Sequence, residues 1–250
     1  MKEKIYTIPV NDAYRSDTAC PLCKLRADVE KSTLDFYLGA SLMEPDTRVA
    51  TNKLGFCRDH LSKMYGREIN RLGVGLMLHT HMKQLRSDLE VPVGKACPDK
   101  RTLLRGRDGD YGKRLTELAC LLEKRAADCI VCDKIAFTMD RYLDVLLWMY
   151  FEDEAFREAF VAKKGHCVEH LAFLLRGAAK YLNQNQCSEF VGVLLAMHRE
   201  AFDKLIDDVE WFTLKFDYRN KDKPWGDSKD AIPRAMNMLT GEEIGANDTK

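Results

Sequence analysis

Cysteine and histidine recur along this chain at the spacing of metal ligands. Two Cys-x-x-Cys pairs are each followed by a Cys-x-x-His pair, and the two intervening segments, 24–56 and 133–166, are nearly equal in length. In chain order the eight residues are Cys20, Cys23, Cys57, His60, Cys129, Cys132, Cys167 and His170. Three thiolates and one imidazole form a tetrahedral Zn²⁺ site, which is structural when the protein supplies all four ligands. The pattern therefore predicts two closed Cys3His zinc sites, one in each half of the chain.

The same cysteines are open to other uses. An iron–sulfur cluster is the main alternative, although clusters usually take four cysteines. A Cys-x-x-Cys pair also suits thiol–disulfide chemistry, but the distant Cys-x-x-His pair adds nothing to that reaction. Two zinc ions are therefore the expected cofactors, with an iron–sulfur cluster as the alternative.

The repeat extends beyond the paired ligands. These pairs recur in the same order at a nearly constant offset, and residues 75–81 match residues 192–198 at a slightly larger one. The matches predict an internal duplication that places His81 and His198 at equivalent positions. Each of these two histidines has two interpretations. It is a hydrogen-bonded core histidine, or it acts at the metal site, either as a hydrogen-bond donor to a ligand or as a fifth ligand if the site opens. His79 lies two residues before His81, so their side chains point about 200° apart on a helix.

A polar stretch between the first two ligand pairs offers a candidate ligand-binding surface. We expect its contact residues to be Glu44, Asp46, Arg48 and Asn52, with His79 from a later helical segment. The alternative is a solvated loop whose polar residues cap neighbouring helices. The second half carries different chemistry at the corresponding place, so the first half is the better candidate for a binding role.

Apolar residues with helical spacing dominate the chain, and alternating strand patterns are nearly absent. We therefore predict an all-α fold, a duplicated helical bundle with each half held by its own Cys3His knuckle. Residues 1–90 are expected to form the first repeat with an N-terminal arm, and residues 113–216 the second. Residues 91–112, rich in Gly, Pro and charge, are the expected linker. Residues 217–250 are expected to be an irregular C-terminal tail.

Charge and hydropathy restrict the classes of partner. The 250 residues include 39 basic and 39 acidic side chains, so no global charge favours nucleic acid. The N-terminus lacks the apolar run of a signal peptide, and the most apolar window is too short to span a bilayer. We expect a soluble cytoplasmic protein that binds neither nucleic acid nor membrane.

Several short stretches resemble a known family. They are residues 8–13, 20–23, 43–46, 51–57 and 78–81. The similar family is a bacterial domain of unknown function with paired C-x2-C…C-x2-H motifs, and the resemblance covers most of residues 5–215. It implies a cytoplasmic bacterial protein, and it implies no activity, substrate or partner.

Two classes of function are compatible with these features. The first is a zinc-stabilised helical binding or scaffold module, whose partner is a protein or a small molecule. The second is a metal- or redox-dependent enzyme or sensor that uses one site as an iron–sulfur cluster or an open metal centre. The sequence contains no recognisable catalytic constellation: a Gly-rich phosphate loop, a nucleophile elbow and an HExxH motif are all missing.

Overall fold

The computed structural model describes residues 6–98, 109–163 and 165–241, and every regular element in these ranges is helical. The α-helices and 3-10 helices (η) are α1 (Thr7–Arg15), α2 (Pro21–Leu38), η2 (Ala40–Met43), α3 (Pro45–Leu54), α4 (Arg58–Gly66), α5 (Arg71–Ala96), α7 (Gly109–Ala127), α8 (Ile130–Glu152), α9 (Glu154–Val161), α10 (Val168–Tyr181), α11 (Gln184–Leu214), η3 (Tyr218–Asn220), η4 (Gly226–Ser228) and α12 (Ala231–Thr240). None of the helices in these ranges is long and apolar enough to cross a lipid bilayer. The all-α prediction is confirmed, whereas the internal duplication stays a prediction.

The chain divides into two compact units that do not follow the two predicted halves. One, here the N/C unit, combines the described residues up to Asp28 with those from Phe137 onward. The other, the middle unit, comprises the described residues of Val29–Ala136. The chain therefore passes from one unit into the other within α2 and returns within α8.

An aromatic cluster forms the core of the N/C unit. Tyr14 of α1 stacks on Phe160 of α9, and Tyr150 of α8 contacts both Phe160 and Phe190 of α11 edge-on. Phe160 and Phe190 contact each other with tilted rings. All four rings are at most 2 % exposed. Burying such a ring contributes about 1.5–3 kcal/mol to folding. His166 lies in the same cluster, with its Nε2 2.8 Å from the hydroxyl oxygen of Tyr14.

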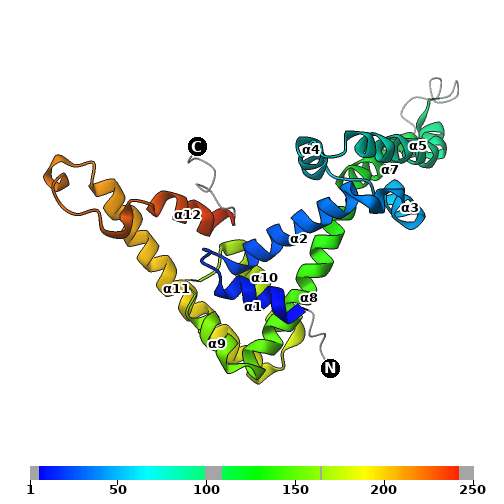
Figure 1. The fold of residues 1–250 in the computed structure, drawn as a ribbon. Helices are drawn as coiled ribbons and strands as arrows, with labels where there is room; N and C mark the ends of the chain where they lie inside the picture. The colour runs from blue at the N-terminus through cyan, green and yellow to red at the C-terminus, as the bar shows by residue number, and fades with distance from the viewer. Residues whose placement is uncertain (1–5, 99–108, 164, 242–250) are drawn as a thin grey trace. The chain divides into compact units, whose positions relative to one another are not determined.

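The described C-terminal part of the N/C unit ends in a helix, α12. Helix α12 folds back along α11 in Figure 1 and also packs against α10. Before it, the buried Lys215 donates from Nζ to three backbone carbonyls of the connecting loop. The prediction of an irregular tail is therefore wrong for residues 231–240, because Ile232, Met236 and Leu239 recur at helical spacing and Pro233 lies in the tolerant first turn. Residues 242–250 of that tail lie outside the described residues.

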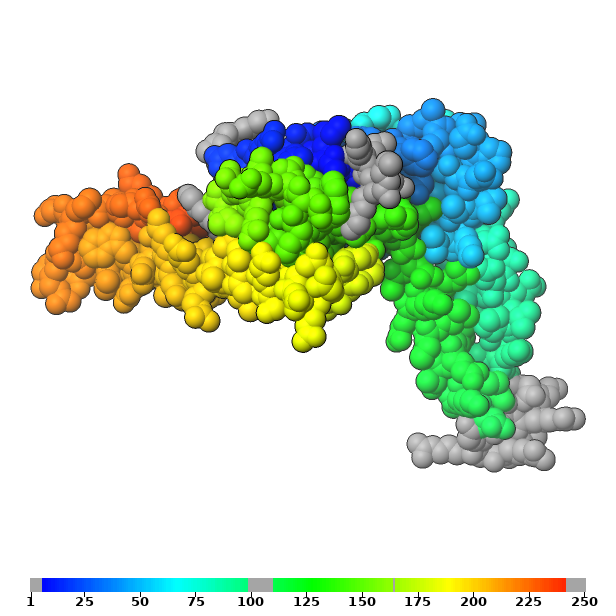
Figure 2. Space-filling view, turned by 90° about the horizontal axis from the view of Figure 1, so that it is seen from below, coloured from blue at the N-terminus to red at the C-terminus, as the bar shows by residue number. Residues whose placement is uncertain are grey.

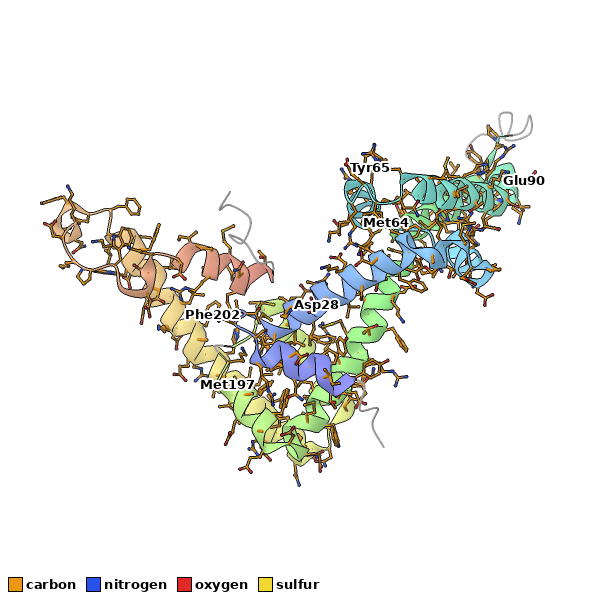
Figure 3. All side chains as sticks on the ribbon, in the orientation of Figure 1. Asp28, Met64, Tyr65, Glu90, Met197 and Phe202 are labelled. Atoms are coloured by element: carbon orange, nitrogen blue, oxygen red, sulfur yellow. The ribbon has the colours of Figure 1, made fainter. Side chains whose placement is uncertain are left out.

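The middle unit is built on α5, which packs against both α3 and α7. Figure 2 shows α5 and α7 side by side, and Arg125 of α7 pairs with Asp88 of α5. Asn70 caps α5, since its side chain accepts from the N–H of Gly73 and donates to the carbonyl of Leu38. On α4, Met64 is buried and Tyr65 is exposed, and Figure 3 shows these neighbouring side chains pointing different ways.

Three further segments differ from the sequence expectations. The N-terminal arm contains α1, a helix with Val10, Ala13 and Tyr14 buried. The polar stretch after Met43 is mostly α3, because Pro45 occupies the first turn, where its missing N–H costs nothing. The predicted linker is helical at 91–96 and 109–112, and its central residues 99–108 lie outside the described part of the chain.

The buried pair of Tyr14 and His166 gives a first prediction. Tyr14→Phe leaves Nε2 of His166 without a hydrogen-bond partner, so the free energy of unfolding should fall by about 1–3 kcal/mol. His166 directly precedes Cys167, as Phe56 directly precedes Cys57, so His166→Phe introduces the residue type found at the corresponding position. The double variant should recover most of the lost stability. Urea denaturation of both single variants and the double variant measures the coupling. Strictly additive losses would contradict a direct interaction.

Candidate metal centres

The eight predicted ligands meet in two groups of four, but in an unexpected combination. Quartet A consists of Cys20, Cys23, Cys167 and His170; quartet B consists of Cys57, His60, Cys129 and Cys132. Within each quartet the ligand atoms all lie within 4.8 Å of one another. Each Cys-x-x-Cys pair therefore joins the Cys-x-x-His pair of the other predicted half. The expectation that each half closes its own knuckle is wrong.

Helix length explains why the pairing is exchanged. Cys23 lies in the first turn of α2, an 18-residue helix that carries the chain about 27 Å along its axis. Cys132 lies in the first turn of α8, a 23-residue helix that carries the chain about 35 Å. A rigid rod after each Cys-x-x-Cys pair takes the following chain away from that pair. The ligand spacing alone does not distinguish the two pairings. The segment between a Cys-x-x-Cys pair and the next Cys-x-x-His pair is also long enough to fold back, so that both pairs could bind the same ion.

Every ligand pair lies at the start of a helix. Cys20, Cys57, Cys129 and Cys167 each directly precede a helix, and the second ligand follows three residues later in its first turn. Quartet A thus joins the N-termini of α2 and α10, and quartet B joins those of α4 and α8. Helix N-termini carry free N–H groups and partial positive charge, which stabilise thiolates. In quartet B burial acts to raise the pKa of Cys57, but the backbone N–H groups at the start of α4 and the neighbouring cysteines lower it overall.

The donor atoms have the dimensions of a single-ion tetrahedron. The sulfurs of Cys23 and Cys167 are 3.6 Å apart, and those of Cys57 and Cys132 are 3.9 Å apart. Nδ1 of His170 lies 3.2–3.6 Å from the three sulfurs of quartet A, and Nδ1 of His60 lies 3.1–3.4 Å from those of quartet B. Tetrahedral zinc with ordinary bond lengths has edges of about 3.8 Å between sulfurs and about 3.6 Å between sulfur and nitrogen. The residues therefore fit one ion per quartet.

The electrostatics of the quartets also favour a cation. Burial and the neighbouring Cys129 raise the pKa of Cys132 to about 12. Hydrogen bonds with Cys167 and Cys20 raise the pKa of Cys23 far above its usual range. Several thiols at van der Waals distance cannot all ionise without a compensating charge. A divalent cation supplies that charge and displaces the protons, so metal affinity should fall as the pH falls.

Quartet B has an outer layer of charged residues. Nε2 of His60 lies 3.0 Å from a carboxylate oxygen of Glu30, which also accepts from Lys63 at 2.7 Å. Lys63 pairs in addition with Asp59 at 3.0 Å. A carboxylate on the far nitrogen holds the imidazole in one tautomer and directs Nδ1 toward the metal. Glu30, Asp59 and His60 form a further carboxylate–histidine group, and this outer layer accounts for it.

Quartet A is covered by the end of α12. Gly241 ends that helix in a left-handed conformation, with φ of 77°. A Cβ added at Gly241 would lie 3.1 Å from the sulfur of Cys167 and 3.6 Å from that of Cys23. Backbone therefore lies close to the two sulfurs, and a side chain at this position would be disfavoured by both the conformation and the approach.

His81 and His198 lie outside both quartets. Nδ1 of His81 is 2.8 Å from the carbonyl oxygen of Asn52, and its ring packs on Gly55 so closely that a Cβ there would meet it at 2.5 Å. His198 packs near Gly165 and Phe202. Within the described ranges, Nδ1 of His198 is buried without a hydrogen-bond partner. The geometry favours a packing role for both, against the glycine that precedes each Cys-x-x-His pair.

The polar stretch of the first half is engaged in helix packing. Arg48 donates to the carbonyl of Leu76 and to the hydroxyl of Thr80, which in turn donates to Asn52. These contacts join α3 to α5. Glu44 and Asp46 are exposed at the N-terminus of α3, where carboxylates suit the helix dipole. His79 is exposed on α5, and a ligand-binding role for these five residues stays a prediction.

Sequence reasoning missed three contributors to the sites. Glu30 belongs to no recognisable motif. It lies seven residues after Cys23, which places it two turns farther along the same helix. Gly241 lies far beyond His170 along the chain, with no local signal of proximity. The pair of Tyr14 and His166 becomes visible only when α1 packs on α9.

Comparison with known proteins adds a family and no activity. The family model described as "Family of unknown function (DUF6062)" matches residues 1–245. No curated protein and no solved structure matches the chain.

The exchanged pairing can be tested one ligand at a time. Cys57→Ala should remove one of two metal ions and make Cys129 and Cys132 reactive toward iodoacetamide, while Cys20 and Cys23 stay protected. Elemental analysis and mass spectrometry of alkylated peptides measure both effects. Cys167→Ala is the matched control and should give the opposite pattern. Exposure of Cys20 and Cys23 in the Cys57→Ala protein would instead support pairing within each half.

His81→Ala separates packing from ligation. The variant loses the hydrogen bond to the Asn52 carbonyl, so its free energy of unfolding should fall by about 1–3 kcal/mol with metal content unchanged. His79→Ala, at an exposed position of the same helix, is the control and should change neither quantity. Loss of a metal ion from the His81→Ala protein would show that the ligand set is wrong.

Proposed function

Because this chain belongs to DUF6062, a family of unknown function, we propose a function from its own residues: a zinc-stabilised helical module that binds a protein or a small ligand. The observation that carries the proposal is the closure of both quartets by four protein donors each. A saturated tetrahedral site leaves no position for water or substrate, so its ion acts on structure. The ions then hold together the starts of α2 and α10 in the N/C unit and those of α4 and α8 in the middle unit.

Zinc suits the quartets better than an iron–sulfur cluster. A cluster places its ligands on several iron atoms, which spreads them farther apart than the edges of one tetrahedron. The sulfur–sulfur distances of 3.6 and 3.9 Å support a single ion in each quartet. Three thiolates with one imidazole are a common donor set of structural zinc.

The described surface supports a binding role. A depression of about 700 Å³ lies along α8 and α9 of the N/C unit, and both apolar and charged side chains line it. Leu72 and Met82 are more than half exposed on α5, as is Ile206 on α11. Helices held by metal can present such side chains in a fixed arrangement.

The metal content of the purified protein tests this proposal. We expect a colourless protein with two zinc ions per chain, because all eight donors converge. A strong chelator should lower the melting temperature by many degrees, since structural zinc contributes about 10 kcal/mol or more to folding. Elemental analysis and calorimetry measure the two effects. Brown protein containing iron would favour the enzyme or sensor alternative, and protein without metal would contradict both.

A further inference from the structure

The two quartets share their donor types and differ in exposure to solvent. In quartet A, Cys20 and Cys167 are at most 5 % exposed, and Cys23 is half-buried. In quartet B, Cys129 is 2 % exposed, whereas Cys57 is half-buried and Cys132 is exposed. Quartet B therefore includes a fully exposed cysteine, Cys132, whereas the most accessible cysteine of quartet A is half-buried.

Each quartet has its own support. The backbone of Gly241 covers the sulfurs of Cys23 and Cys167 in quartet A. In quartet B the carboxylate of Glu30 holds the buried His60, which faces the ion beside the buried Cys129. Quartet B thus has an anchored buried pair and a more open pair, Cys57 and Cys132, whose sulfurs are 3.9 Å apart.

We propose that Cys57 and Cys132 form a peroxide-sensitive thiolate pair whose oxidation to a disulfide releases the metal ion of quartet B. Quartet A keeps its ion under the same conditions. This inference rests on the proposed zinc function, and it assigns the two ions different tasks. The ion of the N/C unit is a permanent structural cross-link, and the ion of the middle unit is a cross-link that responds to oxidant.

The reaction balances with hydrogen peroxide as the oxidant. The exposed Cys132 thiolate attacks one peroxide oxygen, which breaks the O–O bond, forms a sulfenic acid and leaves hydroxide. The Cys57 thiolate then attacks that sulfur, forms the S–S bond and displaces a second hydroxide. Two protons from solvent convert the two hydroxides to water. Two thiolates lose two electrons in total, and the ion loses two of its four ligands.

The geometry suits the second step. A disulfide requires the sulfurs to approach to about 2 Å, so they must close a gap of about 2 Å from their present separation. Both cysteines lie at helix starts, where side-chain rotation leaves the helical hydrogen bonds intact. The departure of the cation also removes the charge that holds the quartet together, so release and disulfide formation reinforce each other.

The experiment uses the full chain loaded with two zinc ions. Cys97, Cys120 and Cys187 lie outside the quartets, so they are changed to serine to remove competing thiols. Hydrogen peroxide is added, zinc release is followed with a coloured chelator, and disulfides are mapped by mass spectrometry after alkylation. We expect one equivalent of zinc to leave about tenfold faster than the second, together with a Cys57–Cys132 disulfide. Reductant with added zinc should restore the starting state.

Two single-site variants serve as matched controls. Cys23→Ser leaves only the ion of quartet B, which should be lost rapidly to peroxide. Cys132→Ser leaves only that of quartet A, which should resist it. Equal release rates from the parent protein, or a first disulfide among Cys20, Cys23 and Cys167, would overturn the inference, even if a variant failed to fold. A protein that binds no zinc at all would instead overturn the proposed function.

Discussion

Both units depend on the convergence of four soft donors at one point. In each quartet, three sulfurs and an imidazole nitrogen lie at the edge lengths of a tetrahedron around one ion. Without a cation, such a group of buried donor atoms is unfavourable, because thiols this close to one another resist ionisation. With a cation it becomes a cross-link. Quartet A joins residues 144 positions apart and quartet B joins residues 75 positions apart, so each closes a long loop.

Helix termini make this convergence possible. Each ligand pair needs two donors on one tight turn, and a helix start supplies that turn together with N–H groups aimed at the sulfurs. Two helix starts that face each other make a complete site. The helices that begin at the ligand pairs adjoin packed elements: Tyr150 of α8 lies in the aromatic cluster, α10 packs against α11 and α12, and α4 packs against α5. An ion bound in each quartet would thus act on helices that apolar packing also holds.

The surroundings of the two quartets distinguish them. A glycine backbone lies on the sulfurs of quartet A, while a carboxylate orients the histidine of quartet B and Cys132 of that quartet is exposed. Thiolate reactivity follows access as well as charge. The same donor set therefore lies in two different environments, to which Gly241 and Glu30 contribute from outside the motifs.

The sequence by itself determined the helical class and the eight donors, because helical periodicity and ligand spacing are local properties that survive without knowledge of packing. It also predicted that His81 and His198 are equivalent, and each packs beside the glycine before a Cys-x-x-His pair. Only the tertiary structure decided which pairs share an ion. That choice depends on the direction in which the long helices α2 and α8 carry the chain, and a residue count contains no direction. The same holds for Glu30 and Gly241, whose contacts with the quartets arise from helices that meet in space and not from any neighbouring motif.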